Sequence, residues 1–141
     1  MPLPNLQQAK RELDERGFVV LPGFIDPAWL TELQQTTEGQ FEVEGAEAGS
    51  EFKIETGSRR LANLINKGEA FQRVVAEPRL LAYVELVLGS EFKLSSLNAR
   101  SANPHNEISQ PLHADMGAIA DEHGYWVCNS VWMLDNFTEE N

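Results

Sequence analysis

Apolar residues recur at helical spacing at the start of the chain. The pattern predicts a helix over residues 5–16, with an apolar side made of Leu6, Ala9 and Leu13. Gly17 is expected to end this helix, because glycine readily adopts the backbone conformation of a helix C-terminus. Residues 18–21 are all apolar, which predicts a short buried strand closed by a Pro-Gly turn.

Three further helices are predicted downstream. Asp26-Pro27 indicates a helix start, because aspartate caps free backbone amides and proline suits the first helical position. The apolar side of this helix is expected to consist of Trp29, Leu30 and Leu33. Gly68 precedes a short helix whose apolar side comprises Phe71, Val74 and Val75. Pro78 begins another helix, ended by Gly89, with an inward side made of Leu81, Val84 and Leu88.

Apolar and polar residues begin to alternate after the helices, which predicts a strand over residues 92–99. Two further extended segments are expected at 108–115 and 126–134, the first of them after a turn at 103–106. Helices that precede strands in this way predict an α+β fold, in which the helices cover one face of a sheet.

Residues 38–55 interrupt the pattern of apolar positions. This stretch contains six glutamates and three glycines against one lysine. We interpret it as a solvated, mobile loop. A cation or partner site is the other interpretation, but the carboxylates have no regular ligand spacing.

Composition narrows the class of protein. The chain of 141 residues has 11 Lys and Arg against 22 Asp and Glu, a net charge of −11. This balance argues against a general binder of nucleic acid or anionic membranes, because both need a basic surface. No apolar run approaches the ~20 residues of a membrane span, and the single Cys128 excludes an internal disulfide. We therefore expect one soluble, cytoplasmic domain over residues 1–141; the oligomeric state is not predicted.

The candidate for metal chemistry is a histidine and a carboxylate two residues apart, His113 and Asp115. On a strand such residues point to the same face, so that both can hold one ion. They would form two members of the 2-His-1-carboxylate triad, which binds Fe(II) and leaves positions open for O₂. A hydrogen-bonded surface pair fits the same two residues. The other histidines, His105 and His123, lie in predicted loops, and neither is preferred as a third ligand.

The chain around this pair resembles the phytanoyl-CoA dioxygenase family. The resemblance rests on Gln110-Pro-Leu-His-Ala-Asp-Met-Gly117, followed by Asn129-Ser-Val-Trp-Met-Leu-Asp-Asn-Phe-Thr-Glu-Glu-Asn141. Arg16-Gly-Phe-Val-Val-Leu-Pro-Gly-Phe-Ile-Asp26 resembles the family's first strand and turn. Arg60-Leu-Ala-Asn-Leu-Ile-Asn-Lys-Gly68 resembles its middle segment.

The resemblance implies a fold and a chemistry. The fold would be a double-stranded β-helix, or jelly roll, with helices packed outside. The activity would be that of an Fe(II)- and 2-oxoglutarate-dependent dioxygenase, in which His113 and Asp115 are the first two iron ligands and a small molecule reacts with O₂. The family's second histidine ligand and its 2-oxoglutarate-binding arginine have no matching position here. The chain is therefore expected to be the N-terminal portion of such a domain, with little or no turnover as it stands.

The resemblance also points to a residue for the co-substrate. In related enzymes a polar residue on the preceding strand contacts 2-oxoglutarate, and Asn98 is the candidate here, ahead of Arg100. An outward-facing strand residue is the alternative for Asn98. Pocket lining and core packing are both open for Met116, Trp126 and Trp132. Cys128 is expected to be buried and inert, and surface charges are expected at Arg59, Arg60 and Lys67.

Two alternatives to the oxygenase remain open. The chain could be a catalytically inactive fragment or degenerate paralogue that acts as a binding or interaction module. It could also be a cupin-like metal enzyme of another type, in which His123 completes the site.

Overall fold

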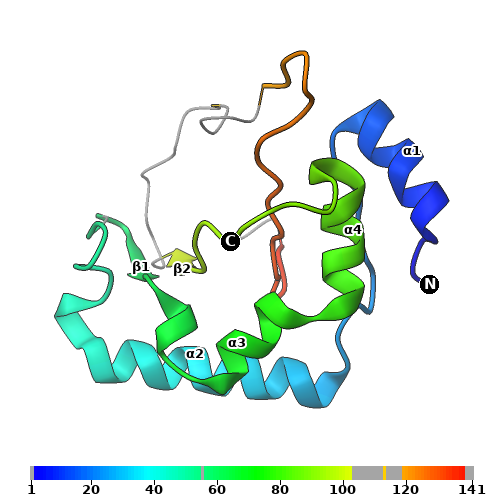
Figure 1. The fold of residues 1–141 in the computed structure, drawn as a ribbon. Helices are drawn as coiled ribbons and strands as arrows, with labels where there is room; N and C mark the ends of the chain where they lie inside the picture. The colour runs from blue at the N-terminus through cyan, green and yellow to red at the C-terminus, as the bar shows by residue number, and fades with distance from the viewer. Residues whose placement is uncertain (1, 55, 103–112, 114–118, 139–141) are drawn as a thin grey trace. The chain divides into compact units, whose positions relative to one another are not determined.

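The computed structural model describes residues 2–54, 56–102, 113 and 119–138 (Figure 1). The elements are, in chain order, α1 (Leu6–Arg16), α2 (Pro27–Glu44), the 3-10 helix η1 (Gly45–Glu47), β1 (Ser58–Leu61), the 3-10 helix η2 (Leu64–Asn66), α3 (Glu69–Ala76), α4 (Pro78–Leu88) and β2 (Ala99–Ala102). They belong to two compact units, which are described one after the other.

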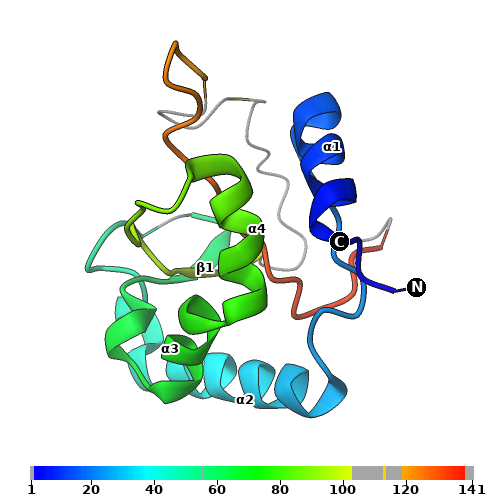
Figure 2. The same ribbon diagram turned by 45° about the vertical axis from the view of Figure 1, so that its right-hand side comes forward.

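The first unit comprises Met1–Asp26, Ala76–Lys93 and Leu112–Val131. Its helices α1 and α4 lie side by side (Figure 2). The Asn5 side chain caps α1 by accepting from the backbone N–H of Gln8 at 2.9 Å, and Gly17 ends the helix as predicted, with a φ of 76°. The Tyr83 hydroxyl of α4 donates to the Pro4 carbonyl oxygen at 2.6 Å, which fixes the chain before α1 against α4.

Helix α4 begins and ends where the sequence predicts. Pro78 occupies the first turn, and Gly89 ends the helix by donating its N–H to the carbonyl oxygen of Glu85. The inward side is shifted from the prediction, however. Leu80 is the buried residue of this helix, whereas only half-burial is found for the predicted Leu81, Val84 and Leu88.

The prediction of a buried strand at residues 18–21 is wrong. These residues form neither helix nor strand, although the predicted turn follows at Pro22-Gly23. Phe18 is 50% exposed and Val20 63% exposed. The Arg16 guanidinium lies 4.3 Å from the centre of the Phe18 ring and covers one of its faces. An apolar run needs a strand partner to become a strand, and the described residues supply none here.

The second unit comprises Pro27–Val75, Leu94–Pro111 and Trp132–Asn141. Helix α2 begins at Pro27 as predicted and turns a regular row of residues inward, one every four positions: Trp29, Leu33, Thr37 and Phe41. The core cluster of this unit is made of Phe41, Leu61, Leu64 and Phe71. Partly buried residues packed against it are Ala48, Leu97 and Ala99.

The glutamate-rich stretch is not the loop that the sequence predicts. Helix α2 extends to Glu44 and η1 follows at once, so the first half of the stretch is helical. Arginine and lysine side chains from later in the chain neutralise three of its glutamates. Glu38 accepts from both terminal nitrogens of Arg59, at 2.6 and 3.0 Å, and this bidentate hydrogen bonding lowers the pKa of Glu38.

Lys67 is not the surface charge that the sequence predicts. Its side chain is only 11% exposed, and its ammonium group lies 2.7 Å from Glu44 and 2.8 Å from Glu51. The Gln40 amide donates to the same Glu44 carboxylate at 2.7 Å. The cluster thus ties α2 and the turn after η1 to the segment that leads into α3. Arg59, by contrast, is exposed as predicted, and its guanidinium lies 4.3 Å from the centre of the Phe41 ring.

The turn after η1 requires glycine at position 49. Gly49 has a φ of 85°, and a Cβ added there would lie 2.9 Å from the carbonyl oxygen of Arg60 and 3.0 Å from that of Lys53. The carbonyl oxygen of Gly49 accepts hydrogen bonds from the backbone N–H groups of Phe52 and Lys53. This close approach holds the turn against β1.

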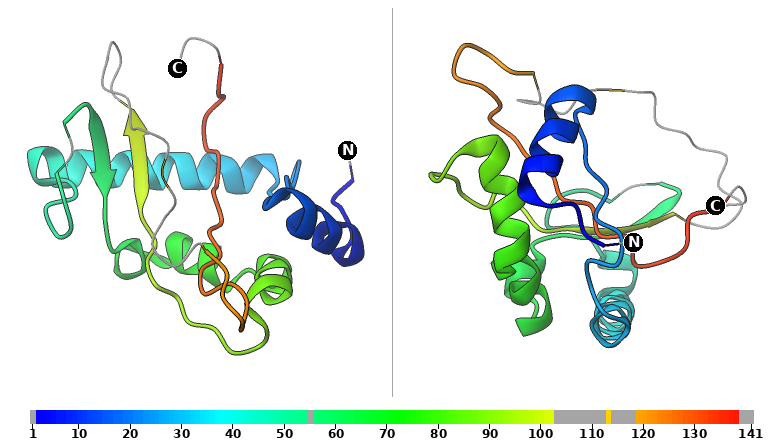
Figure 3. Two further views of the ribbon diagram at one scale, coloured as in Figure 1. Left: turned by 90° about the horizontal axis from the view of Figure 1, so that it is seen from above. Right: turned by 90° about the vertical axis from the view of Figure 1, so that its right-hand side faces the viewer.

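Strands β1 and β2 form a two-stranded antiparallel sheet, paired from Ser58 with Ala102 to Leu61 with Ala99 (Figure 3, left). The sequence did not predict β1, and β2 begins where the predicted strand 92–99 was to end. Residues 92–98 and 126–134 form no strand, which corrects both predictions. The α+β class is thus confirmed only coarsely, as helices combined with one small sheet.

Candidate functional site

His113, the histidine of the predicted metal pair, has an exposed side chain and lies in neither helix nor strand. Its predicted partner Asp115 lies outside the described residues, as do His105 and Met116. The turn at 103–106 and all of the segment 108–115 except His113 also lie outside them. The shared face of the pair therefore stays a prediction.

His123 lies in a tight loop that is organised by Asp121. One carboxylate oxygen of Asp121 accepts from the backbone N–H of His123, and the other accepts from the indole N–H of Trp126, each at 2.8 Å. Backbone hydrogen bonds of 3.0 and 3.1 Å join Asp121 and Gly124 in both directions. The hydrogen bond from Trp126, followed by that from His123, lowers the pKa of Asp121. The loop is thus built around a carboxylate that is ionised at neutral pH.

The imidazole of His123 belongs to no metal cluster among the described residues. Its side chain is 69% exposed, and Nε2 lies 3.5 Å from the Glu122 carboxylate. The ring also stands edge-on to Trp126, with 6.3 Å between the ring centres. Within the described ranges no three His, Cys, Asp or Glu side chains converge on a common point.

Asn98, the candidate for the co-substrate, lies directly before β2 on the face that is turned away from the core. Leu97 and Ala99 pack against the core cluster, so the alternation of an extended chain places Asn98 and Arg100 on the opposite face. Both side chains are exposed. The Asn98 amide donates to the Ser96 hydroxyl at 3.3 Å. The outward orientation is the alternative that the sequence left open for Asn98, and the co-substrate role stays a prediction.

The same face of the sheet carries two guanidinium groups. Arg100 is paired directly with Arg60 of β1, and residues opposite each other in an antiparallel pair point to the same side. Arg60 is half-buried, with its guanidinium 4.5 Å from the centre of the Phe52 ring. It is therefore more enclosed than the surface charge that the sequence predicts. Polar groups that can hold a carboxylate thus collect on the face opposite the core.

The comparison with protein families decides the assignment. The family model "Phytanoyl-CoA dioxygenase (PhyH)" matches residues 13–141, which is nearly the whole chain. The chain belongs to the phytanoyl-CoA dioxygenase family. No curated protein and no solved structure matches it.

Membership of the PhyH family confirms the resemblance seen in the sequence and gives the protein's class. The family is one of oxygenases with a jelly-roll fold that generally depend on Fe(II) and 2-oxoglutarate. The helices and the small antiparallel sheet of the described residues are compatible with an incomplete form of that fold. Among these residues, no helix has the length and apolar character that crossing a membrane requires.

The aromatic and sulfur residues weighed from the sequence have different environments. Trp132 is half-buried and meets Trp29 edge-on, with 5.3 Å between ring centres, which is the geometry of core packing. Trp126 is 64% exposed and lines a pocket. Cys128 is half-buried, and this burial raises the pKa of its thiol, in keeping with the inert role expected of it.

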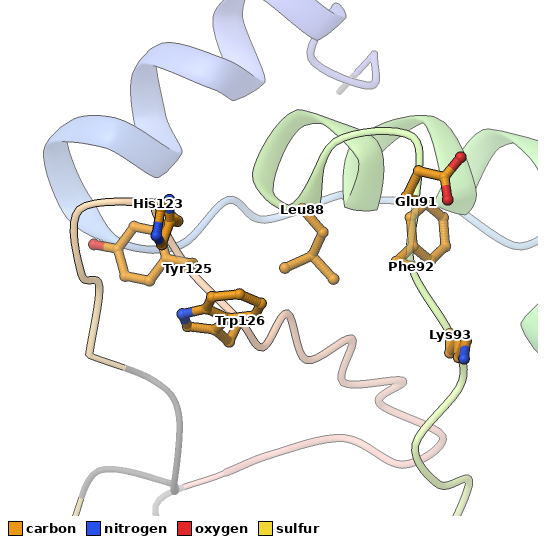
Figure 4. Close-up of a pocket in the computed structure, with 7 residues that line it drawn as sticks. All are labelled: Leu88, Glu91, Phe92, Lys93, His123, Tyr125 and Trp126. Atoms are coloured by element: carbon orange, nitrogen blue, oxygen red, sulfur yellow. The ribbon is translucent and has the colours of Figure 1, made fainter.

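The pocket beside Trp126 lies within the first unit and has a volume of about 400 Å³. His123, Tyr125 and Trp126 line it from one segment, and Leu88 with the residues just after α4 line it from the other (Figure 4). Sequence reasoning missed Glu91, Phe92, Lys93 and Tyr125 as site residues. The alternation that begins at Phe92 predicts a strand, whereas Phe92 and Lys93 line a pocket.

Proposed function

We propose that this PhyH-family protein is an Fe(II)- and 2-oxoglutarate-dependent dioxygenase that hydroxylates a small organic substrate. His113 and Asp115 are two of its iron ligands, and residues 1–141 belong to one domain. The observation that carries the proposal is the family match over residues 13–141, which spans the His-x-Asp pair. The side chain of His113 is exposed.

The donor set fits the metal. A neutral imidazole and a carboxylate are ligand types that non-haem Fe(II) takes in this class of enzyme. Asp115 lowers the net charge of the site, and His113 binds through a neutral ring nitrogen. Because both ligands have to be deprotonated, iron affinity falls as the solution is acidified. When bound, iron with 2-oxoglutarate supplies the oxidising power for hydroxylation of an unactivated C–H bond.

The chain's own contribution to co-substrate binding is assigned to Asn98. Its exposed amide can donate to a carboxylate oxygen of 2-oxoglutarate after exchanging its 3.3 Å hydrogen bond with Ser96. Arg100 extends from the same face two residues further on and adds positive charge beside the amide. The proposal predicts that Asn98→Ala raises the KM for 2-oxoglutarate several-fold more than it lowers kcat.

Metal binding by the 141-residue chain tests the ligands directly. Anaerobic titration with Fe(II) is expected to show one site in the wild type. His113→Ala and Asp115→Ala should each weaken it by about tenfold or more. His105→Ala is the matched histidine control and should leave the affinity unchanged. An affinity that survives His113→Ala would refute the ligand assignment, and a loss in His123→Ala would favour the cupin-like alternative.

The reaction is tested on the protein as its gene encodes it. Iron-dependent release of succinate from 2-oxoglutarate is expected, and it should disappear in His113→Ala and Asp115→Ala. Iron binding without any succinate release, over a range of candidate substrates, would favour the binding-module alternative. These two experiments therefore separate the metal site from the activity.

A further inference from the structure

The pocket in the first unit combines aromatic walls with two opposite charges. Tyr125 and Trp126 stand on one side, Phe92 on the other, and Leu88 lies between them (Figure 4). The volume of about 400 Å³ is within the range of small-molecule sites. All of its lining residues belong to the same compact unit.

The aromatic side of the pocket is held in place before any ligand arrives. Trp126 is fixed by its indole hydrogen bond to Asp121, and the backbone bonds between Asp121 and Gly124 close the loop. Since the indole N–H is already used, Trp126 offers a ligand only its ring surface. Its exposed fraction of 64% and that of 50% for Tyr125 leave both rings open to contact. Such surfaces attract alkylated ammonium groups and apolar groups.

The charged side of the pocket is formed by Glu91 and Lys93. Both line the pocket, and both are exposed. Across the described part of the chain neither side chain has a hydrogen-bond or ion-pair partner, and they do not pair with each other. Glu91 and Lys93 therefore offer a carboxylate and an ammonium group at the same rim of the pocket. The Glu91 carboxylate is turned away from Tyr125 and Trp126 (Figure 4), and an exposed side chain can rotate toward a ligand.

We propose that this pocket binds a small zwitterion that carries an alkylated ammonium group and a carboxylate. The ammonium group contacts the ring faces of Tyr125 and Trp126 and is balanced by Glu91, while the carboxylate pairs with Lys93. A simple organic cation would leave Lys93 without a function and beside a like charge. A simple carboxylate would leave the aromatic walls and Glu91 without a function. The site requires neither iron nor 2-oxoglutarate.

Three probes of nearly equal shape test the proposal on the full chain without added metal. Glycine betaine carries both charges, choline lacks the carboxylate, and 3,3-dimethylbutyrate lacks the positive charge. Binding is measured by titration calorimetry and by the NMR shift of the Trp126 indole N–H. Glycine betaine is expected to bind saturably, and the other two probes at least about fivefold more weakly.

Matched variants identify the groups that recognise each charge. Glu91→Gln and Tyr125→Leu should each weaken glycine betaine by about three- to tenfold. Lys93→Gln should remove the preference for glycine betaine over choline. Glu85→Gln, on the exposed surface of α4, and Lys53→Gln make the same charge changes outside the pocket and should have no effect.

The proposal is overturned if glycine betaine neither shifts the Trp126 resonance nor gives a saturable heat. It is equally overturned if choline or 3,3-dimethylbutyrate binds as tightly, or if the control variants weaken binding as much as the pocket variants do. The three-probe comparison uses the unmodified chain. It therefore tests the proposal even if a variant fails to fold, as judged by the loss of its helical circular dichroism signal. Repeating it in His113→Ala separates this site from the proposed iron site, because glycine betaine binding should persist there.

Discussion

Replacing Lys67 by methionine is expected to destabilise the protein by about 2–3 kcal/mol. Methionine keeps the length and apolar contacts of the side chain but removes its charge. Breaking a buried ion pair costs about 3–5 kcal/mol, because the remaining charge stays desolvated. The pair here is nearly buried, with side chains of Lys67 and Glu44 that are 11% and 16% exposed, whereas Glu51 is 45% exposed and can turn to water. The expected loss of about 2–3 kcal/mol is therefore smaller than the cost of breaking a fully buried ion pair.

Urea unfolding followed by circular dichroism at pH 7 measures the effect, with thermal unfolding as a second readout. For a chain of this length the loss corresponds to a fall in Tm of about 8 °C. The control is Lys53→Met, which makes the same change at an exposed lysine. The control should stay within about 0.5 kcal/mol of the wild type. Equal losses in the two variants would show that the Lys67 ion pairs contribute nothing of their own.

The pH dependence of this difference provides a sharper test. Burial alone would raise the pKa of Glu44, but hydrogen bonds from Lys67 and Gln40 lower it overall. Its contribution is therefore present above its unfolded pKa and is lost as the pH falls through the folded value. Burial alone would lower the pKa of Lys67, but Glu44 and Glu51 raise it overall, so its contribution disappears only as the pH rises through that raised value.

The wild type and Lys67→Met should accordingly differ most between about pH 5 and pH 10. Below this window Glu44 becomes neutral in both proteins, and the difference should shrink. A difference that is the same at pH 3 as at pH 7 would refute the electrostatic explanation and leave only a change in packing.

Three further results are expected. Gly49→Ala should destabilise the protein by about 2–4 kcal/mol in urea unfolding, because Gly49 has a positive φ and the added Cβ would meet backbone atoms. Gly39→Ala should stabilise it by about 0.5–1 kcal/mol, because the added Cβ lies within a helix and meets nothing within 4 Å. Changes of the same sign in both variants would contradict the steric argument. Alkylation of Cys128 by iodoacetamide should reach half its maximal rate at a higher pH than a free thiol does, and an equal midpoint would contradict the effect of burial. Asp121→Asn should shift and broaden the NMR signal of the Trp126 indole N–H, and an unchanged signal would show that this carboxylate does not hold the loop.

The helices could be predicted from the sequence because their signals are local. The N-terminal helix and its glycine stop, the start at Pro27, and the helix after Gly68 all follow from spacing and capping within a few residues. Tertiary partners could not be predicted in this way. The sequence around Lys67 indicates a surface charge, because its ion-pair partners Glu44 and Glu51 are distant in the sequence and meet it only in the folded chain.

The strands show the limit of pattern reasoning more clearly. An alternating run indicates an extended chain, but it becomes a strand only where another segment supplies hydrogen bonds. Residues 92–98 alternate and form no strand, whereas Ala99–Ala102 pair with β1, a segment with two consecutive arginines that the pattern did not single out. The predicted metal pair has the same dependence, because its shared face requires a strand around His113.

The orientation of the β1–β2 sheet links the fold to the proposed chemistry. One face is apolar and packs on the core, with Leu61 from β1 and Ala99 from β2. Burial of that face fixes the register, since a shift by one residue would turn Leu61 outward and an arginine into the core. The same register sets Arg100 on the other face, and the alternation of the extended chain before β2 sets Asn98 there as well. The position of the candidate co-substrate residues thus follows from the packing of their apolar neighbours. Leu61→Ala should therefore weaken 2-oxoglutarate binding and also lower the free energy of unfolding. Asn98→Ala should weaken 2-oxoglutarate binding alone.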